Sequence, residues 1–136
     1  MEEAQRAWIR SARSEGKRGN MQAVRLYTGD DGESHFEEIE LDFQPDRNME
    51  STSLGDAKSV HVRRVPPGVL LDWHPAPRRQ YLFTLSGQWD IECGGGEVRR
   101  FQTGDIMLAD DLTGRGHRSR VIGDEPHVFA VVPLAD

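Results

Sequence analysis

The sequence predicts an all-β domain, a sandwich or barrel of short strands. Three observations support this prediction. Apolar and polar residues alternate over many short stretches, which is the period of a half-buried strand. Glycine, proline, asparagine and aspartate separate these stretches at close, regular intervals, as turn residues do. Helix-period patterning is nearly absent, and no alternation of strands with helices suggests a parallel sheet.

The predicted strands number about nine or ten. Two of them lie in residues 21–28 and 37–43 and are joined by a turn at 29–32, whereas the polar stretch 44–58 is predicted to be a loop. Further strands are expected at 60–65, 69–74, 80–85, 88–93, 97–101, 106–109, 117–123 and 127–134.

The length of 136 residues is typical of one domain. Residues 1–20 are charged and mildly helical by propensity, so we interpret them as an N-terminal extension that forms a short helix or a tail. Residues 21–136 are predicted to form a single β-barrel domain.

The charge balance bounds the partners. Seventeen basic against 23 acidic residues give a net charge of −6, which argues against a protein that binds nucleic-acid phosphates. No apolar run reaches the length that spans a bilayer, and the first residues lack the features of a signal peptide. We therefore expect a cytoplasmic protein that binds neither nucleic acid nor membrane. The single cysteine, Cys93, is interpreted as a bystander thiol because no base adjoins it in the sequence.

A motif of fixed spacing lies in the middle of the chain. It reads Gly68-x5-His74-x-Ala76-x3-Gln80-x6-Gly87. This pattern resembles the first motif of the cupin superfamily, whose general form is G-x5-H-x-H-x3-4-E-x6-G. A looser counterpart of the second cupin motif, G-x5-P-x-G-x2-H, follows later in the chain, with a longer loop and without its proline.

The second motif runs from Gly104 to His117, and the whole resemblance covers roughly residues 60–134. The chain most resembles small, single-domain, RmlC-like cupins of undefined function. The resemblance implies a double-stranded β-helix, which is a jelly-roll barrel with a pocket at one mouth, and a homodimer as the common assembly. In such cupins three histidines and a glutamate hold a divalent metal in the pocket.

The chain departs from this pattern at two ligand positions. Ala76 stands where the second histidine is expected, and Gln80 stands where the glutamate is expected. A neutral amide carries no negative charge, so the affinity for a divalent cation should fall. Two alternatives stay open: a site for iron, zinc, nickel or manganese on His74, Gln80 and His117, or a polar pocket with no metal cofactor.

Residues around the motif are candidates for the chemistry of such a pocket. His74 and His117 are the candidate catalytic groups, because imidazole exchanges protons near neutral pH. Gln80, Arg79, Trp73 and Thr84 are candidates for binding a substrate: Arg79 could pair with a carboxylate, and Thr84 shares a strand face with Gln80.

Three other residues have a plainer interpretation. Asp110 and Asp111 precede His117 and could supply a base or a ligand, but loop carboxylates are usually solvated. His127 begins the last strand and is interpreted as a surface or packed histidine.

Three functions remain in view. The first is the binding of a small organic molecule in the barrel pocket, with a metal-independent isomerase as its enzymatic form. The second is a metal-dependent oxidoreductase or dioxygenase that uses His74, Gln80 and His117. The third is a non-catalytic structural or interaction dimer. Fold analogy alone does not choose among them, nor does it decide whether the protein is an enzyme.

Overall fold

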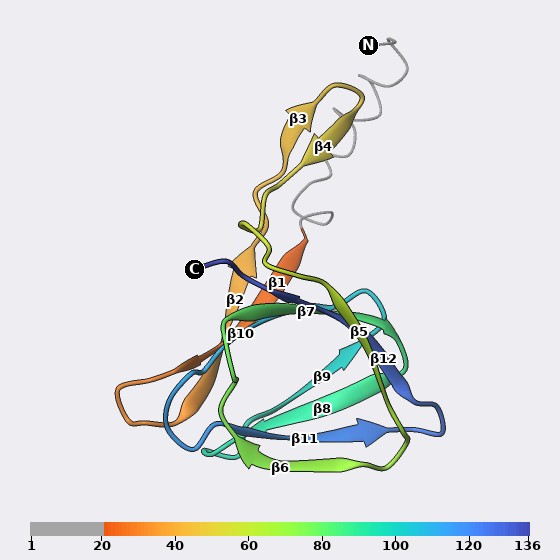
Figure 1. Ribbon diagram of the computed structural model, residues 1–136. Coiled ribbons are helices and arrows are strands. Elements are labelled where there is room, and N and C mark those ends of the chain that lie inside the picture. The colour runs from red at the N-terminus through yellow and green to blue at the C-terminus, as the bar shows by residue number, and fades with distance from the viewer. Residues whose placement is uncertain (1–20) are drawn as a thin grey trace. The chain divides into compact units, whose positions relative to one another are not determined.

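The computed structural model describes residues 21–136, so the helix or tail predicted for residues 1–20 lies outside the described residues. The described residues form twelve strands in three sheets and no helix (Figure 1). The predicted all-β class is therefore confirmed. No membrane-spanning helix is present within residues 21–136.

The strands follow in chain order with short connections. Their bounds are β1 (Gln22–Thr28), β2 (Ser34–Glu40), β3 (Gln44–Asp46), β4 (Met49–Ser51), β5 (His61–Val65), β6 (Leu70–His74), β7 (Gln80–Ser86), β8 (Gln88–Cys93), β9 (Val98–Gln102), β10 (Ile106–Asp110), β11 (His117–Ile122) and β12 (His127–Pro133). A six-stranded sheet has the order β2-β1-β10-β7-β12-β5, and a four-stranded sheet has the order β6-β11-β8-β9. Strand β1 is parallel to β10. Strand β10 is antiparallel to β7, β12 is antiparallel to both β7 and β5, and β11 is antiparallel to both β6 and β8.

The described chain divides into two compact units. The larger unit comprises residues 23–38 and 55–136 and contains the two main sheets. The smaller unit includes Met21, Gln22 and residues 39–54.

The smaller unit corrects one prediction. The stretch 44–58 was expected to be a loop, but β3 and β4 pair within it as an antiparallel hairpin. Arg47, at the turn, has a positive φ of 61°, a conformation that side chains other than glycine adopt rarely. The sequence gives no sign of these strands because their residues are exposed or half-buried, and hence carry no apolar alternation.

The larger unit encloses its core between the inner faces of the two main sheets. Along β12 every second residue is buried, which is the alternation expected of a strand with one inward face. The inward residues form one apolar cluster, to which the six-stranded sheet contributes Leu26, Leu82, Met107, Ala109, Phe129 and Val131, and the four-stranded sheet contributes Trp89, Ile91, Cys93 and Phe101. Burying a large apolar side chain stabilises the fold by about 1.5–3 kcal/mol. The core therefore depends on both sheets closing on each other.

Candidate functional site

His74 and His117 meet at one mouth of the barrel. They are paired residues on the antiparallel strands β6 and β11, and their ring centroids lie 4.8 Å apart. Gly116 makes this approach possible, because a Cβ added there would lie 2.1 Å from the carbonyl carbon and oxygen of His74. Its φ of +81° is also in the region that favours glycine. The glycine before His117 thus sets the spacing of the two imidazoles.

Both histidines line a cavity of about 230 Å³ between the sheets. Most of the lining is apolar, with a few polar groups among it. The lining residues are Arg63, Leu71, His74, Pro75, Ala76, Pro77, Gln80, Leu82, Trp89, Met107, Ala109, His117, Ser119, Phe129 and Val131. The structure therefore brings together His74, Gln80 and His117, which the sequence singled out, and the Ala76 that interrupts the metal motif.

Each imidazole of the pair is held through Nδ1. The Nδ1–H of His74 donates to the main-chain carbonyl of Asp72 at 2.7 Å, and the Nδ1–H of His117 donates to Oδ2 of Asp111 at 2.7 Å. A carbonyl and a carboxylate only accept, so the proton lies on Nδ1 and the neutral rings carry their lone pair on Nε2. Among the described residues neither Nε2 has a hydrogen-bond partner. The two lone pairs are available to a ligand.

Asp111 is the residue that fixes His117. Its side chain is fully buried, and Oδ2 also accepts a 2.7 Å hydrogen bond from the hydroxyl of Ser34. Its main-chain oxygen accepts from the amide of Ala76 at 2.9 Å. The interpretation of Asp111 as a solvated loop carboxylate was therefore wrong. Its partner Ser34 is 77 residues away in the chain, so the sequence around Asp111 does not reveal the contact.

Comparisons with known proteins give only partial similarity to solved structures. No family model matches the chain, and no curated protein matches its sequence. The similar solved structures include the DMSP lyase DddQ from Ruegeria pomeroyi DSS-3, at 24% identity over 60% of this chain with a TM-score of 0.49. The match spans only 40% of the lyase chain.

Two further solved structures are of comparable similarity. An uncharacterized conserved protein with a double-stranded β-helix domain from Klebsiella pneumoniae subsp. pneumoniae MGH 78578 is 26% identical over 60% of this chain and 79% of its own, with a TM-score of 0.45. A Cupin 2 conserved barrel domain protein from Salinispora arenicola CNS-205 is 18% identical over 68% of this chain and 81% of its own, with a TM-score of 0.46.

The topology of this chain itself supports the fold that the motif implies. Two facing sheets enclose a cavity, and the histidines of the two motif halves lie side by side at its mouth. The described residues therefore form a barrel of the double-stranded β-helix type. This assignment describes the fold and leaves the chemistry to the residues of the site.

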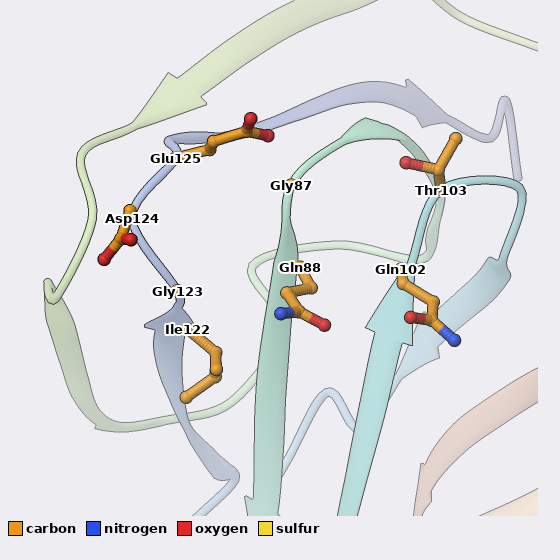
Figure 2. A pocket seen from close by; sticks show the side chains of 8 residues that line it. All are labelled: Gly87, Gln88, Gln102, Thr103, Ile122, Gly123, Asp124 and Glu125. Carbon is orange, nitrogen blue, oxygen red and sulfur yellow. The ribbon is translucent and has the colours of Figure 1, made fainter.

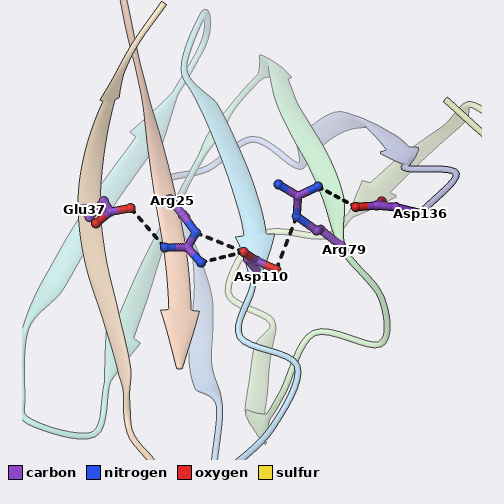
Figure 3. A network of polar contacts seen from close by, with 5 residues as sticks. All are labelled: Arg25, Glu37, Arg79, Asp110 and Asp136. Carbon is purple, nitrogen blue, oxygen red and sulfur yellow. Dashed lines mark hydrogen bonds and ion pairs between the residues drawn. The ribbon is translucent and has the colours of Figure 1, made fainter. Parts of the chain in front are cut away.

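Arg79 is engaged in an ion-pair network rather than in the cavity lining. Figure 3 shows the chain of contacts from Glu37 through Arg25, Asp110 and Arg79 to Asp136. Arg79 contacts Asp110 at 3.5 Å and Asp136 at 2.8 Å. The network also shows that Asp110 is paired and largely buried, which corrects its interpretation as a solvated carboxylate. The role of Arg79 in binding a substrate stays a prediction that this geometry does not favour.

Trp73 and Thr84 also lie outside the cavity lining. The Trp73 ring is covered by the guanidinium groups of Arg115 and Arg118, at 4.3 and 5.1 Å from its centroid. The Thr84 hydroxyl lies 3.0 Å from Nε2 of His127 within the core. Strand alternation explains Trp73, because its neighbour His74 points inward and adjacent side chains on a strand point to opposite faces.

His127 is a packed histidine, as one of its two interpretations held. It is fully buried between Trp89 and Phe129, with ring centroids 4.6 Å from each, and its Nδ1 has no partner among the described residues. Burial lowers the pKa of His127 to about 4. The imidazole is therefore neutral at physiological pH.

Cys93 is equally inert. It is buried, and burial together with the nearby carboxylates, chiefly Glu97, raises the pKa of its thiol to about 12. A thiol in this state carries almost no thiolate at neutral pH. The interpretation of Cys93 as a bystander agrees with its environment.

Arg63 is a site residue that the sequence did not single out. It pairs with Phe129 between β5 and β12, and directly opposed residues of antiparallel strands point to the same face. Phe129 is buried and lines the cavity, so Arg63, although an exposed residue, lies on the same face of the sheet as the cavity. The alternation of β5 misleads, because the apolar Val62 points outward and is 66% exposed. Only the register reveals which face is inside.

A second hollow, of about 460 Å³, lies at the far end of the four-stranded sheet (Figure 2). It is lined by Gly87, Gln88, Gln102, Thr103, Ile122, Gly123, Asp124 and Glu125, and shares none of these with the histidine cavity. Gln88 begins β8 and Ile122, its partner, ends β11, whereas His117 begins β11. The two hollows are therefore at opposite ends of these strands. Its polar side chains are two amides, two carboxylates and the Thr103 hydroxyl, and it has no histidine.

The donor set of the histidine cavity does not fit the metal centre of the family pattern. Its lining offers two imidazoles and the Gln80 amide but no carboxylate. Within the described residues no group of three histidine, cysteine, aspartate or glutamate side chains could hold an ion. Asp111 is committed to His117 and Ser34 through one oxygen, while Oδ1 is buried without a described partner. We therefore derive no chemical step through a metal.

Proposed function

We propose that this cupin binds a small organic molecule in the cavity between its sheets, where His117 takes up or releases a proton. The observation that supports this proposal is the buried Ser34–Asp111–His117 hydrogen-bond chain, which ends at the cavity. A carboxylate bonded to Nδ1–H fixes the tautomer of the ring and stabilises the imidazolium that forms when Nε2 accepts a proton.

The cavity suits a small ligand with one or two polar groups. About 230 Å³ is below the range of pockets that hold drug-sized molecules. Apolar side chains from both sheets, such as Leu82 and Trp89, supply burial. Gln80 is a buried residue that lines the cavity, and its amide has no hydrogen-bond partner among the described residues. The amide can orient a carbonyl or hydroxyl group of the ligand beside His117.

The reaction that these groups support is a metal-independent proton shift. Nε2 of His117 would accept a proton from a C–H next to a carbonyl, and the C–H electron pair would move to the carbonyl oxygen as an enolate. The amide of Gln80 would donate to that oxygen. Return of the proton from His117 to another position or face completes an isomerisation with no oxidant, reductant or leaving group.

The binding proposal is tested by filling the cavity. Ala76→Leu places a larger side chain in the lining, and Ala130→Leu is the matched control on β12, because residues that alternate with the buried Phe129 and Val131 face outward. The probes are acids, amides and alcohols of about three to six carbon atoms, detected by saturation-transfer NMR. We expect wild type and Ala130→Leu to bind at least one probe and Ala76→Leu to lose it. Equal binding by all three proteins, or by none, would contradict the proposal.

The proton-transfer proposal is tested with a bound probe that has an acidic C–H. In deuterated buffer, wild type should exchange that hydrogen, and Asp111→Asn and His117→Gln should exchange it at least about 100-fold more slowly. His35→Gln is the control, because His35 lies outside the cavity and pairs with Asp31. If His117→Gln exchanged at the wild-type rate, His117 would not be the base.

A metal-dependent oxidoreductase or dioxygenase is the second candidate. One observation favours it: both imidazoles have Nδ1 held by an acceptor and Nε2 without a described partner, which is the arrangement of many ligating histidines. Elemental analysis after a zinc, iron, nickel or manganese titration distinguishes the two candidates. Stoichiometric metal that is lost in both His74→Ala and His117→Ala would replace our first proposal with this one. A dimer that binds neither probe nor metal would instead favour a structural or interaction role.

A further inference from the structure

We infer that the ligand of the cavity is a small organic carboxylate, and that Arg63 binds its carboxylate group. This inference rests on the proposed function, because it assigns a ligand class to the same cavity. It goes beyond the proposal in naming the charge of the ligand and the residue that recognises it.

Strand pairing places Arg63 on the cavity side of β5. On β5, Arg63 is opposite Phe129, and its neighbour Arg64 is opposite Val128. Phe129 is buried and lines the cavity, whereas Val128 belongs to the alternate, half-buried set of β12. Two arginines adjacent in sequence therefore occupy opposite faces of the sheet. Only Arg63 lines the cavity.

The cavity lining carries a positive charge and no carboxylate. The chain carries 23 acidic and 17 basic residues, yet the fifteen residues that line the cavity include no aspartate or glutamate. Arg63 is the one permanently charged group among them. Six other arginines form ion pairs with carboxylates: Arg25, Arg79, Arg99, Arg100, Arg115 and Arg118. Within residues 21–136 five arginines have no such pair: Arg47, Arg63, Arg64, Arg78 and Arg120. Of these five only Arg63 lines the cavity, so its guanidinium is free for an anion there.

The shape of the Arg63 guanidinium favours a carboxylate over other anions. A guanidinium presents a planar fork of N–H donors that matches the two oxygens of a carboxylate. A phosphate group would bring nearly two charges, and the cavity offers only this single guanidinium against it. The apolar remainder, including Leu71 and Val131, fits a short hydrocarbon body. The carboxylate on Arg63 would then place that body toward the imidazoles.

The test compares probes that differ only in charge. Butanoate with butanamide, and 2-oxobutanoate with 2-oxobutanamide, are titrated into the labelled full-length protein, and dissociation constants are read from the indole N–H resonance of Trp89. The variants are Arg63→Gln and, as the matched control, Arg64→Gln. Hydrogen bonds to a charged group favour the carboxylate by roughly 10- to 100-fold. We expect this preference in wild type and Arg64→Gln and its loss in Arg63→Gln.

The outcomes separate this inference from the proposed function. If amides bind as tightly as acids, or if Arg63→Gln retains the preference, the carboxylate assignment is wrong while a small-molecule cavity stands. Tighter binding of inorganic phosphate than of any carboxylate overturns the choice of anion. If no acid, amide or alcohol binds, the proposed function fails and the inference fails with it. A folded Arg63→Gln, shown by an unchanged amide spectrum outside the cavity, validates the comparison.

If that variant is misfolded, Arg63→Lys serves instead, because it keeps the charge without the planar fork. It should lose at least about tenfold in carboxylate affinity, and an undiminished affinity overturns bidentate binding.

Discussion

Acidification from pH 7 to pH 4 should destabilise the barrel through His127. This imidazole is fully buried between two aromatic rings, and its only polar contact among the described residues is the Thr84 hydroxyl. Burial disfavours the charged form, which lowers the pKa of His127 from its ordinary 6.5 to about 4 in the folded protein. The unfolded chain binds a proton in this interval and the folded chain does not. Unfolding is therefore favoured as the pH falls.

The size of the effect follows from the two pKa values. The contribution is complete above about pH 6.5, where both states are neutral, and it is lost as the pH falls toward about 4. The difference between those values corresponds to about 3 kcal/mol of unfolding free energy. This is a large share of the roughly 5–15 kcal/mol that is typical of the unfolding free energy of small domains.

The assay is urea denaturation at several pH values between about 7 and 4, for wild type and for the double variant Thr84→Val/His127→Phe. The double variant keeps an aromatic ring in the stack and removes both hydrogen-bonding groups together, so that neither is left unpaired in the core. Relative to wild type, it should gain about 3 kcal/mol between pH 7 and pH 4. His61→Gln removes an exposed imidazole on β5 and should follow the wild-type curve.

Parallel pH dependences would refute the reasoning. If wild type and the double variant lost the same free energy between pH 7 and pH 4, burial of His127 would not be the cause of the loss. The carboxylates of the chain would then account for the acid sensitivity, since they are common to both proteins. A His61→Gln protein that deviated from wild type would point to an exposed histidine instead.

Three other predictions follow from single contacts. Gly116→Ala should cost roughly 2–5 kcal/mol in thermal or urea unfolding, because both its backbone angle and the adjacent β6 backbone oppose a side chain, whereas Gly95→Ala, with nothing within 4 Å, should change little. Cys93, with a thiol pKa raised to about 12, should react with iodoacetamide at pH 8 at least about 100-fold more slowly in the native than in the urea-unfolded protein, and comparable rates would contradict its burial. Gln80→Glu should weaken butanoate binding by about tenfold or more in NMR titration, because it adds a negative charge to the cavity that Arg63 lines; unchanged affinity would contradict an electrostatic role for the lining.

Local pattern was sufficient to predict most of the barrel. Strands β8, β11 and β12 alternate strictly between buried and more exposed residues, and the sequence shows the same alternation. The β3–β4 hairpin was missed because its side chains are mostly solvated, which leaves no periodic apolar signal. Strand β2 begins earlier than expected, at Ser34, because this serine is buried against Asp111, a contact between residues far apart in the chain.

The site was predictable only where spacing determines it. The motif spacing correctly indicated that His74 and His117 would lie together. His74 ends β6, and His117 begins the paired strand β11 directly after the glycine-bearing loop. The supporting partner Asp111 and the inward position of Arg63 depend on long-range pairing and register. No local pattern contains that information: Asp111 reads as a loop acid, and Arg63 reads as the polar face of its strand.

Strand register also explains how an acidic protein builds a cavity without acids. On β8 the acidic residues Asp90 and Glu92 alternate with buried Trp89 and Ile91, so both carboxylates point outward, where arginines pair with them. Asp111 is buried behind His117 and is not part of the cavity lining; its Oδ2 accepts hydrogen bonds from Ser34 and His117. Among the described residues the carboxylates therefore lie outside the cavity lining, in which Arg63 is the one permanently charged group. Composition alone would have predicted a cationic ligand, whereas the register of β5 predicts an anionic one.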